Sequence, residues 1–236
     1  MPQMTGRIVD GAMSGFGNPG LGLEIIYSFV IIICSLMIYF GTKELYQLSS
    51  HKGINYFRRA FLFFAIAYFF RNFIKFILFY FNIARIIEIS PKTAGILLGH
   101  TTLFIFVYFS SMAIFYLLYS VMWKRWNNSN KVYLFHILAV IISFISILFP
   151  SPFIHLTINL GLLVLVIIIV YISRKNQKKN KSKLYFIYLL LMIFWILNVL
   201  DILVPEFLRT YQIIIYLASI GIFLLILYKV LKKVGN

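Results

Sequence analysis

Residues 153–183, FIHLTINLGLLVLVIIIVYISRKNQKKNKSK, combine the two features on which the architecture of this chain depends. The first part, Phe153–Ser173, holds no charged residue. It is long enough to cross the hydrocarbon core of a bilayer, which takes about 20 helical residues. The second part, Arg174–Lys183, is crowded with lysine and arginine, which short cytoplasmic loops retain. The segment therefore predicts a transmembrane helix whose carboxyl end faces the cytoplasm.

The same alternation recurs along the whole chain. The composition is 62% hydrophobic and 12% charged, with a mean hydropathy of +0.94, which excludes a soluble domain with a covered core. The long apolar runs are Ile25–Thr42, Ala60–Phe81, Ala94–Trp123, Val132–Phe149, Phe153–Ser173, Leu184–Leu200 and Tyr211–Tyr228. We therefore expect an all-α, polytopic membrane protein with seven transmembrane helices, although the second run carries Arg71 and Lys75.

The positions of the basic residues predict the orientation. Of the 22 lysines and arginines, 16 lie in alternate junctions and the carboxyl-terminal tail. Positive residues in short loops stay on the cytoplasmic side. We therefore expect a multi-pass protein of the cell membrane with its amino terminus outside and its carboxyl terminus in the cytoplasm. The net charge of +16 is explained by this bias, without a nucleic acid partner.

The domain organisation is predicted to be simple. Residues 1–20 are rich in glycine and are expected to be a flexible external arm, followed by a single membrane domain over residues 21–236 with short loops and a short basic tail. The densest basic junction is expected to contact anionic lipids or a separate cytoplasmic signalling partner. Its members are Arg174, Lys175, Lys178, Lys179, Lys181 and Lys183.

A faint internal similarity relates two helices. The segment that runs from Tyr56 to Phe81 and the segment from Tyr185 to Val204 both begin with Tyr-Phe after a basic loop, and both carry polar residues late. Helices one to three and five to seven would run in the same directions. A parallel three-plus-one-plus-three repeat is therefore compatible with the sequence.

Polar residues gather in the outer half of the predicted bundle. Counting about 1.5 Å per residue from the inner ends of their helices, Lys75 lies about 22 Å across the membrane and Asn198 about 21 Å. Ionisable residues at such depths are costly unless they have a partner, and they often mark functional sites. The candidate ligand site or polar network is Glu24, Arg71, Asn72, Lys75, His100, His155, Asn198 and Asp201.

Three interpretations of these residues remain open at this stage. In the first, Lys75 pairs with Asp201 and Arg71 bonds to Asn198 or a helix carbonyl, so that the network only locks the helices. In the second, the residues line an outward-facing pocket whose excess of cations suits an anionic ligand. In the third, Lys75 extends its ammonium group to the outer interface.

Signatures of catalysis are missing from the sequence. It has no G-x-S-x-G, no H-E-x-x-H and no glycine-rich phosphate loop, and the histidines lack metal-ligand spacing. We expect no enzymatic activity, no cofactor and no bound metal. Trp123, Trp126 and Tyr133 are interpreted as an aromatic belt at the inner membrane surface.

The arrangement from Leu21 to Val234 resembles, in topology alone, the seven-helix modules with an external amino terminus that precede kinase or cyclase domains in prokaryotic sensors. It departs from microbial rhodopsins because helix seven has no mid-membrane lysine, and from PQ-loop transporters because the hinge motif is absent. The resemblance implies a sensor or signal relay. The alternatives are a small solute transporter and a structural subunit of a membrane complex.

Overall fold

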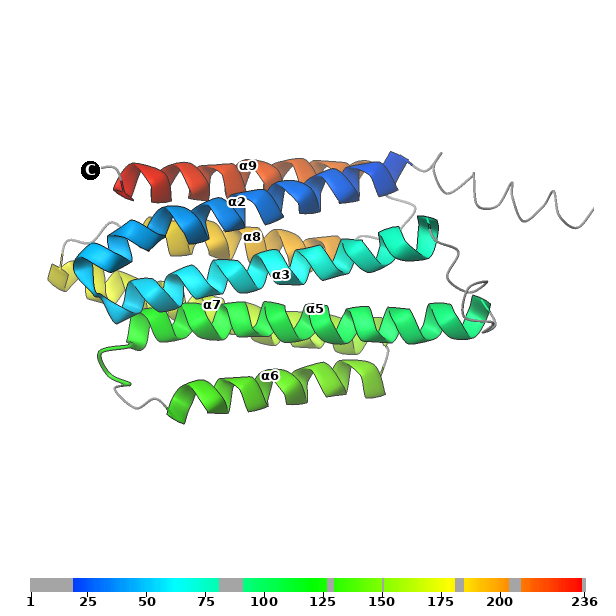
Figure 1. The fold of residues 1–236 in the computed structure, drawn as a ribbon, viewed down its shortest axis with the longest axis horizontal. Helices are drawn as coiled ribbons and strands as arrows, with labels where there is room; N and C mark the ends of the chain where they lie inside the picture. The colour runs from blue at the N-terminus through cyan, green and yellow to red at the C-terminus, as the bar shows by residue number, and fades with distance from the viewer. Residues whose placement is uncertain are drawn as a thin grey trace, which may run out of the picture.

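The computed structural model describes residues 19–80, 91–126, 130–149, 151–180, 185–203 and 209–234, and within them the chain is helical (Figure 1). The helices, labelled as in Figure 1, are α2 (Pro19–Ser49), α3 (Lys52–Tyr80), α5 (Pro91–Met122), α6 (Asn130–Leu148), α7 (Pro152–Asn180), α8 (Tyr185–Leu203) and α9 (Arg209–Val234). The predicted all-α class is confirmed. The predicted external arm lies almost wholly outside the described residues.

Local sequence explains several helix ends. Helices α2, α5 and α7 each begin at a proline, namely Pro19, Pro91 and Pro152. Proline suits the first helical position because its φ is already helical and its missing N–H would have had no partner there. Helix α2 ends as Ser50 adopts a left-handed φ of 47° and donates its backbone N–H to the carbonyl of Tyr46 at 2.8 Å.

Six of the helices are long and apolar enough to cross a membrane. The apolar segments are Gly22–Ser49, Gly99–Met122, Lys131–Leu148, Pro152–Asn176, Tyr185–Leu203 and Tyr211–Lys232. Only a helix can carry an isolated chain segment through hydrocarbon, because all of its backbone hydrogen bonds are internal. The chain is therefore a multi-pass helical integral membrane protein. Helix α3 is not counted among the six, because its side chains from Phe73 to Tyr80 lie outside the described residues.

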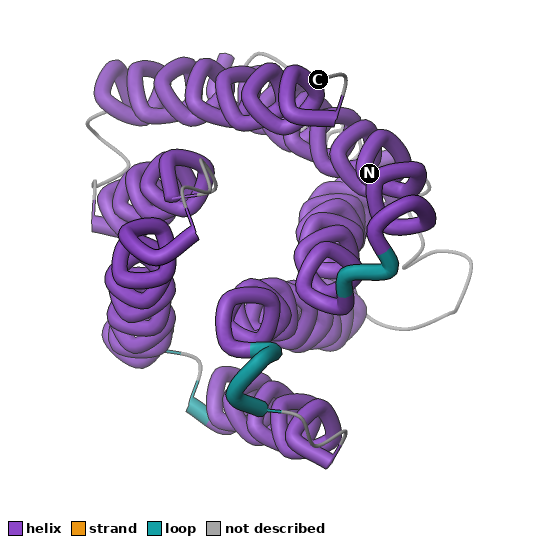
Figure 2. Tube along the Cα trace, turned by 90° about the vertical axis from the view of Figure 1, so that its left-hand side faces the viewer, coloured by secondary structure: helices purple, strands orange, loops and turns teal. Residues whose placement is uncertain are grey.

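Six helices form a ring, and the seventh described helix lies outside it. Around the ring, α2 packs against α3, α3 against α5, α5 against α7, α7 against α8, α8 against α9, and α9 against α2 again. Helix α6 packs chiefly on α5 and makes slight contact with α7, so it lies at the edge of the bundle (Figures 1 and 2). Helices α3 and α8 are therefore not neighbours but stand on opposite sides of the ring.

Aromatic side chains fill the middle of the ring. Phe61 and Phe64 from α3, Phe194 from α8 and Phe223 from α9 are almost completely buried. The ring centroids of Phe194 and Phe223 are 4.8 Å apart in an edge-to-face arrangement, and those of Phe61 and Phe223 are 6.3 Å apart. Lipid tails are as apolar as these side chains, so close packing rather than hydrophobicity holds membrane helices together. The interlocked rings provide that packing.

The outer surface of the bundle is apolar. Phe29, Phe144 and Leu217 are among the large hydrophobic side chains that are more than half exposed, at 61%, 53% and 57%. Such a surface would be unfavourable in water but is the ordinary surface of a protein in hydrocarbon. These side chains contact the lipid bilayer, as the composition predicted.

Candidate functional site

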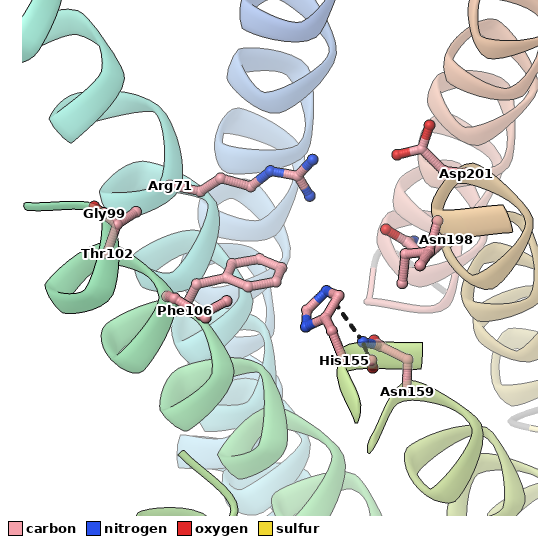
Figure 3. A pocket seen from close by; sticks show the side chains of 10 residues that line it. Arg71, Gly99, Thr102, Phe106, His155, Asn159, Asn198 and Asp201 are labelled. Carbon is pink, nitrogen blue, oxygen red and sulfur yellow. Dashed lines mark hydrogen bonds between the residues drawn. The ribbon is translucent and has the colours of Figure 1, made fainter. Parts of the chain in front are cut away.

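A cavity of about 300 Å³ lies between four helices of the ring (Figure 3). Helix α3 contributes one lining residue, α5 four, α7 two and α8 three. They are Arg71, Gly99, Thr102, Leu103, Phe106, His155, Asn159, Asn198, Asp201 and Ile202. Four of the eight residues that the sequence analysis grouped together line this space. Those four are Arg71, His155, Asn198 and Asp201.

Arg71 is held on one side of the cavity by an ion pair. Its Nη2 donates to Oε1 of Glu24 on α2 at 3.1 Å, and the side chains of the two residues are 23% and 14% exposed. The guanidinium carbon also lies 5.3 Å from the ring centroid of Phe106, within the range of a cation–π contact. One of the three interpretations left open by the sequence bonded Arg71 to Asn198 or a helix carbonyl. The structure bonds it instead to Glu24 on the neighbouring helix α2.

Asn198 is instead held by tyrosine hydroxyl groups. The hydroxyl of Tyr68 on α3 donates to Oδ1 of Asn198 at 2.9 Å, and the hydroxyl of Tyr27 on α2 lies 3.1 Å from that of Tyr68 and 3.4 Å from the same Oδ1. The Nδ2 group of Asn198 donates to the carbonyl of Phe194 at 3.0 Å. These bonds tie α8 to α2 and α3 across the interior of the ring. They fix the position of Asn198, which lines the cavity.

Helix α7 contributes a second polar pair. Nδ2 of Asn159 donates to the carbonyl of His155 at 2.8 Å and lies 3.3 Å from Nε2 of the same imidazole. The indole Nε1 of Trp195 on α8 donates to the carbonyl of Asn159 at 3.2 Å. Nδ1 of His155 is buried and has no hydrogen-bond partner among the described residues. The imidazole thus retains hydrogen-bonding capacity beside the cavity.

Asp201 points into the cavity from the side opposite Arg71 (Figure 3). Its carboxylate acts electrostatically on Arg71 and on the hydroxyl of Tyr216 on α9. Tyr216 in turn stacks on Tyr27 with ring centroids 4.9 Å apart. The cavity therefore has a cation on one side and a carboxylate on the other, with amide and imidazole groups between them.

The remaining predicted residues take other positions. Glu24 does not line the cavity but holds Arg71 in place. Asn72 is half-buried outside the lining, and its Oδ1 has no hydrogen-bond partner among the described residues. His100 is half-buried next to the lining residue Gly99. Lys75 belongs to α3, but its side chain lies outside the described residues, so its pairing with Asp201 stays a prediction.

The predicted basic contact surface is described only in part. Arg174 and Lys175 are exposed at the end of α7. The side chains of Lys178 and Lys179 and the whole of Lys181 and Lys183 lie outside the described residues.

Several lining and supporting residues were missed by the sequence analysis. Tyr27 and Tyr68 were overlooked because tyrosine is common throughout this chain, so its presence in a helix carries little information. Asn159 carried a usable signal. It lies four residues after His155 in an otherwise apolar run, a spacing that places both side chains on one face of a helix. Phe106 carried no signal among the many phenylalanines.

Comparisons with known proteins give one relative. A protein of Archaeoglobus fulgidus named "Uncharacterized protein" is 28% identical over 218 residues, which cover 90% of this chain and 93% of the relative. The similarity therefore extends over nearly the full length of both chains. No protein-family model matches the chain, and no solved structure matches it.

Proposed function

We propose that this protein is a non-enzymatic, seven-span sensor of the cell membrane that binds a small polar solute in the cavity between α3, α5, α7 and α8. The main support for this proposal is the cavity itself, which has a volume of about 300 Å³ and has Arg71 and Asp201 on opposite sides. Cavities of this size are at the lower end of those that hold small molecules. Binding of the solute changes the arrangement of the helices, and this change is transmitted to the basic end of the bundle.

Helix α3 is the seventh span in this proposal. Its 29 residues extend over about 43 Å, which exceeds the thickness of the hydrocarbon core. It occupies the ring position between α2 and α5, both of which are apolar enough to span. Arg71 is tolerated within it because Glu24 supplies a counter-charge from the neighbouring helix.

The distribution of basic residues supports the orientation. Lys43 and Lys52 flank the turn between α2 and α3, and Lys229 and Lys232 lie near the carboxyl end of α9. Short basic segments are retained in the cytoplasm. The cavity is near the opposite ends of these helices, so in this orientation it lies in the outer half of the membrane.

The lining suggests the chemistry of the solute. The Arg71 guanidinium suits a carboxylate, Asp201 suits an ammonium group, and the amide of Asn159 suits either a donor or an acceptor. A small zwitterionic solute of the amino acid class satisfies both charged sides at once. A purely apolar molecule would take up none of the hydrogen-bonding capacity of these polar groups.

Relay of the signal follows from the position of the cavity in the ring. Helices α3 and α8 are not ring neighbours, and their polar groups meet through the hydroxyls of Tyr27 and Tyr68 and the amide of Asn198. A solute that bridges Arg71 and Asp201 adds a new connection between α3 and α8. The relative position of these two helices then depends on occupancy.

Transport is the second candidate, and the ring order is the observation that favours it. Three consecutive helices form each half of the ring, with α6 outside, as a three-plus-one-plus-three protein would require. The buried rings of Phe61, Phe194 and Phe223 fill the middle of the ring below the cavity. In this conformation a transported solute would need those rings to separate.

The test uses the three tryptophans of the chain as reporters. Trp195 contacts the cavity residue Asn159, so a W123F/W126F variant reports from the cavity alone. The purified variant is titrated with common amino acids and small dicarboxylic acids. We expect a saturable change in emission for at least one of them.

Two further variants control this titration. Asp201→Asn keeps the shape of the side chain but removes its charge, and we expect it to weaken binding about tenfold or more. Glu44→Gln removes an exposed carboxylate of α2 that does not line the cavity, and it should leave binding unchanged. No response to any solute, or an equal loss in both variants, would refute a binding site here.

The relay and transport are then separated by two measurements with the solute that binds. In a W195F variant, an emission change from Trp123 and Trp126 at the far end of α5 would support the relay. Accumulation of the solute inside proteoliposomes would instead assign the cavity to a transporter.

A further inference from the structure

A second pocket, of about 260 Å³, lies at the opposite end of α3 from the cavity. It is lined by the end of α2, the first turns of α3 and the end of α5. The lining residues are Tyr46, Lys52, Asn55, Tyr56, Arg59, Tyr119, Trp123 and Trp126. Arg59 and Arg71 are separated by about 18 Å along the helix. The two spaces are therefore distinct, and nothing in the proposed function depends on the second one.

One face of α3 provides the polar side of this pocket. Lys52, Asn55, Tyr56 and Arg59 follow one another at spacings of three, one and three residues, which places them on a single stripe of the helix. The side chains of Lys52 and Arg59 are exposed. The charged groups therefore reach the mouth of the pocket.

Close packing fixes the aromatic side. A Cβ atom on Gly53 would lie 2.8 Å from Cδ1 of Trp123 and 2.9 Å from the backbone oxygen of Ser120, so only glycine allows α3 to approach α5 this closely. The hydroxyl of Tyr119 donates to the carbonyl of Trp126 at 2.7 Å. The rings of Tyr56 and Tyr119 have centroids 4.3 Å apart.

This packing changes the interpretation of the two tryptophans. The sequence analysis assigned Trp123 and Trp126 to an aromatic belt at the membrane surface. Both are half-buried and form a wall of the pocket, whereas Tyr133 is 70% exposed, as a belt residue would be. The close approach of Gly53 to Trp123 and the hydrogen bond from Tyr119 to Trp126 place them in the pocket. Neither contact can be inferred from hydropathy.

The charge in this pocket is not paired with a carboxylate of the residues that the structure describes. Neither Lys52 nor Arg59 has a carboxylate oxygen within 4 Å among the residues that the structure describes. Arg59 is near a neutral hydroxyl, that of Tyr116. Arg58 shows the contrast: it is 7% exposed, its Nε donates to the carbonyl of Tyr39 at 3.1 Å, and its guanidinium lies 4.7 Å from the centroid of the Tyr39 ring.

We infer that this pocket binds a phosphate group. Two cations converge on it, the amide of Asn55 and the tyrosine hydroxyls add hydrogen-bond donors, and Lys124 over the Trp123 ring adds positive charge nearby. A phosphate accepts several charge-assisted hydrogen bonds at once, and arginine and lysine are its usual partners. The phosphate is either that of an anionic lipid headgroup or that of a small soluble molecule.

The experiment again uses tryptophan emission, now in a W195F variant of the full-length protein, in which Trp123 and Trp126 report from the pocket. One arm adds inorganic phosphate to the protein in nanodiscs of phosphatidylcholine. The other arm compares nanodiscs of phosphatidylcholine with nanodiscs that contain phosphatidylglycerol. A saturable response to inorganic phosphate identifies a soluble ligand. A response confined to phosphatidylglycerol identifies a lipid headgroup.

Charge variants decide whether the pocket itself is responsible. Lys52→Gln and Arg59→Gln should each weaken the response about tenfold or more. Lys43→Gln removes an exposed cation from the neighbouring end of α2 that does not line the pocket, and it should leave the response unchanged. The inference is overturned if neither arm gives a response, or if Lys43→Gln weakens it as much as the other two.

Discussion

The two ends of α3 differ in what surrounds their charged side chains. Toward its carboxyl end, Arg71 is paired with Glu24, and the cavity beside it also contains Asp201. Toward its amino end, Lys52 and Arg59 stand beside tyrosines and tryptophans with no carboxylate within 4 Å among the described residues. The first arrangement is compensated within the protein. The second is open to solvent and to the phosphate group that we infer binds there.

This difference predicts how substitutions at each end affect the stability of the protein. A charge that is paired inside the bundle depends on its partner, because removal of the partner leaves the charge buried and uncompensated. A charge that stands at the mouth of an open pocket has water as an alternative and contributes mainly to binding. Substitutions at the cavity end should therefore unfold the protein more readily than charge substitutions at the Lys52–Arg59 pocket.

The largest effect is expected from Glu24→Gln. The Arg71 guanidinium would lose its counter-charge while about three-quarters of its side chain stays buried, so we expect a loss of about 2 kcal/mol in the free energy of unfolding. Chemical unfolding in detergent micelles measures this loss. Glu44→Gln, in the exposed part of the same helix, is the matched control and should change little. Equal stability of the two variants would show that the cavity end is no more dependent on pairing than the surface.

A smaller effect is expected from Gly53→Ala at the other end. The new methyl group would clash with the backbone oxygen of Ser120, which cannot move without shifting α5, so we expect a loss of about 1 to 2 kcal/mol. Gly41→Ala is the matched control. Its Cβ atom would meet the flexible end of Leu231 at 2.9 Å, so it should stay within about 1 kcal/mol of the parent. Chemical unfolding in detergent micelles measures both losses, and Trp123 emission should change in Gly53→Ala alone.

The smallest effect is expected from acidification and involves His51, in the turn between α2 and α3. Burial and the positive charge of Lys124 lower the pKa of His51, and the imidazole packs on Trp123 with centroids 4.6 Å apart. A histidine with a lowered pKa in the folded state contributes stability that is complete above its unfolded pKa, near 6.5, and is lost as the pH falls. The melting temperature of the parent should therefore drop more between pH 7 and pH 5 than that of His51→Gln. Parallel curves for the two proteins would contradict this.

The sequence predicted the grouping of polar residues better than their bonds. Depth along the helices grouped Arg71, Asn198 and Asp201 in the outer half of the bundle, and all three line one cavity. Depth contains no information about which helices are neighbours. Arg71 therefore bonds to Glu24 on the adjacent α2 rather than to Asn198 on the opposite α8.

The residues that were missed share a physical reason. Tyr27 and Tyr68 matter because their hydroxyls meet at 3.1 Å in the centre of the ring, yet along the chain they look like any other aromatic residue of a lipid-facing helix. Gly53 looks like a turn residue, and its importance comes from the approach of α5. In each case the informative quantity is a distance between helices.

The sequence by itself determined the helices, the apolar segments that cross the membrane and the asymmetric distribution of positive charge. It did so because hydrocarbon requires every backbone hydrogen bond to close within its own helix, and because this requirement acts on each segment separately. The tertiary structure alone decided the order of the ring, the position of α6 outside it, the partner of Arg71 and the two pockets at opposite ends of α3. These features depend on how the side chains of neighbouring helices pack together. Because lipid tails are as apolar as those side chains, hydropathy does not distinguish one packing arrangement from another.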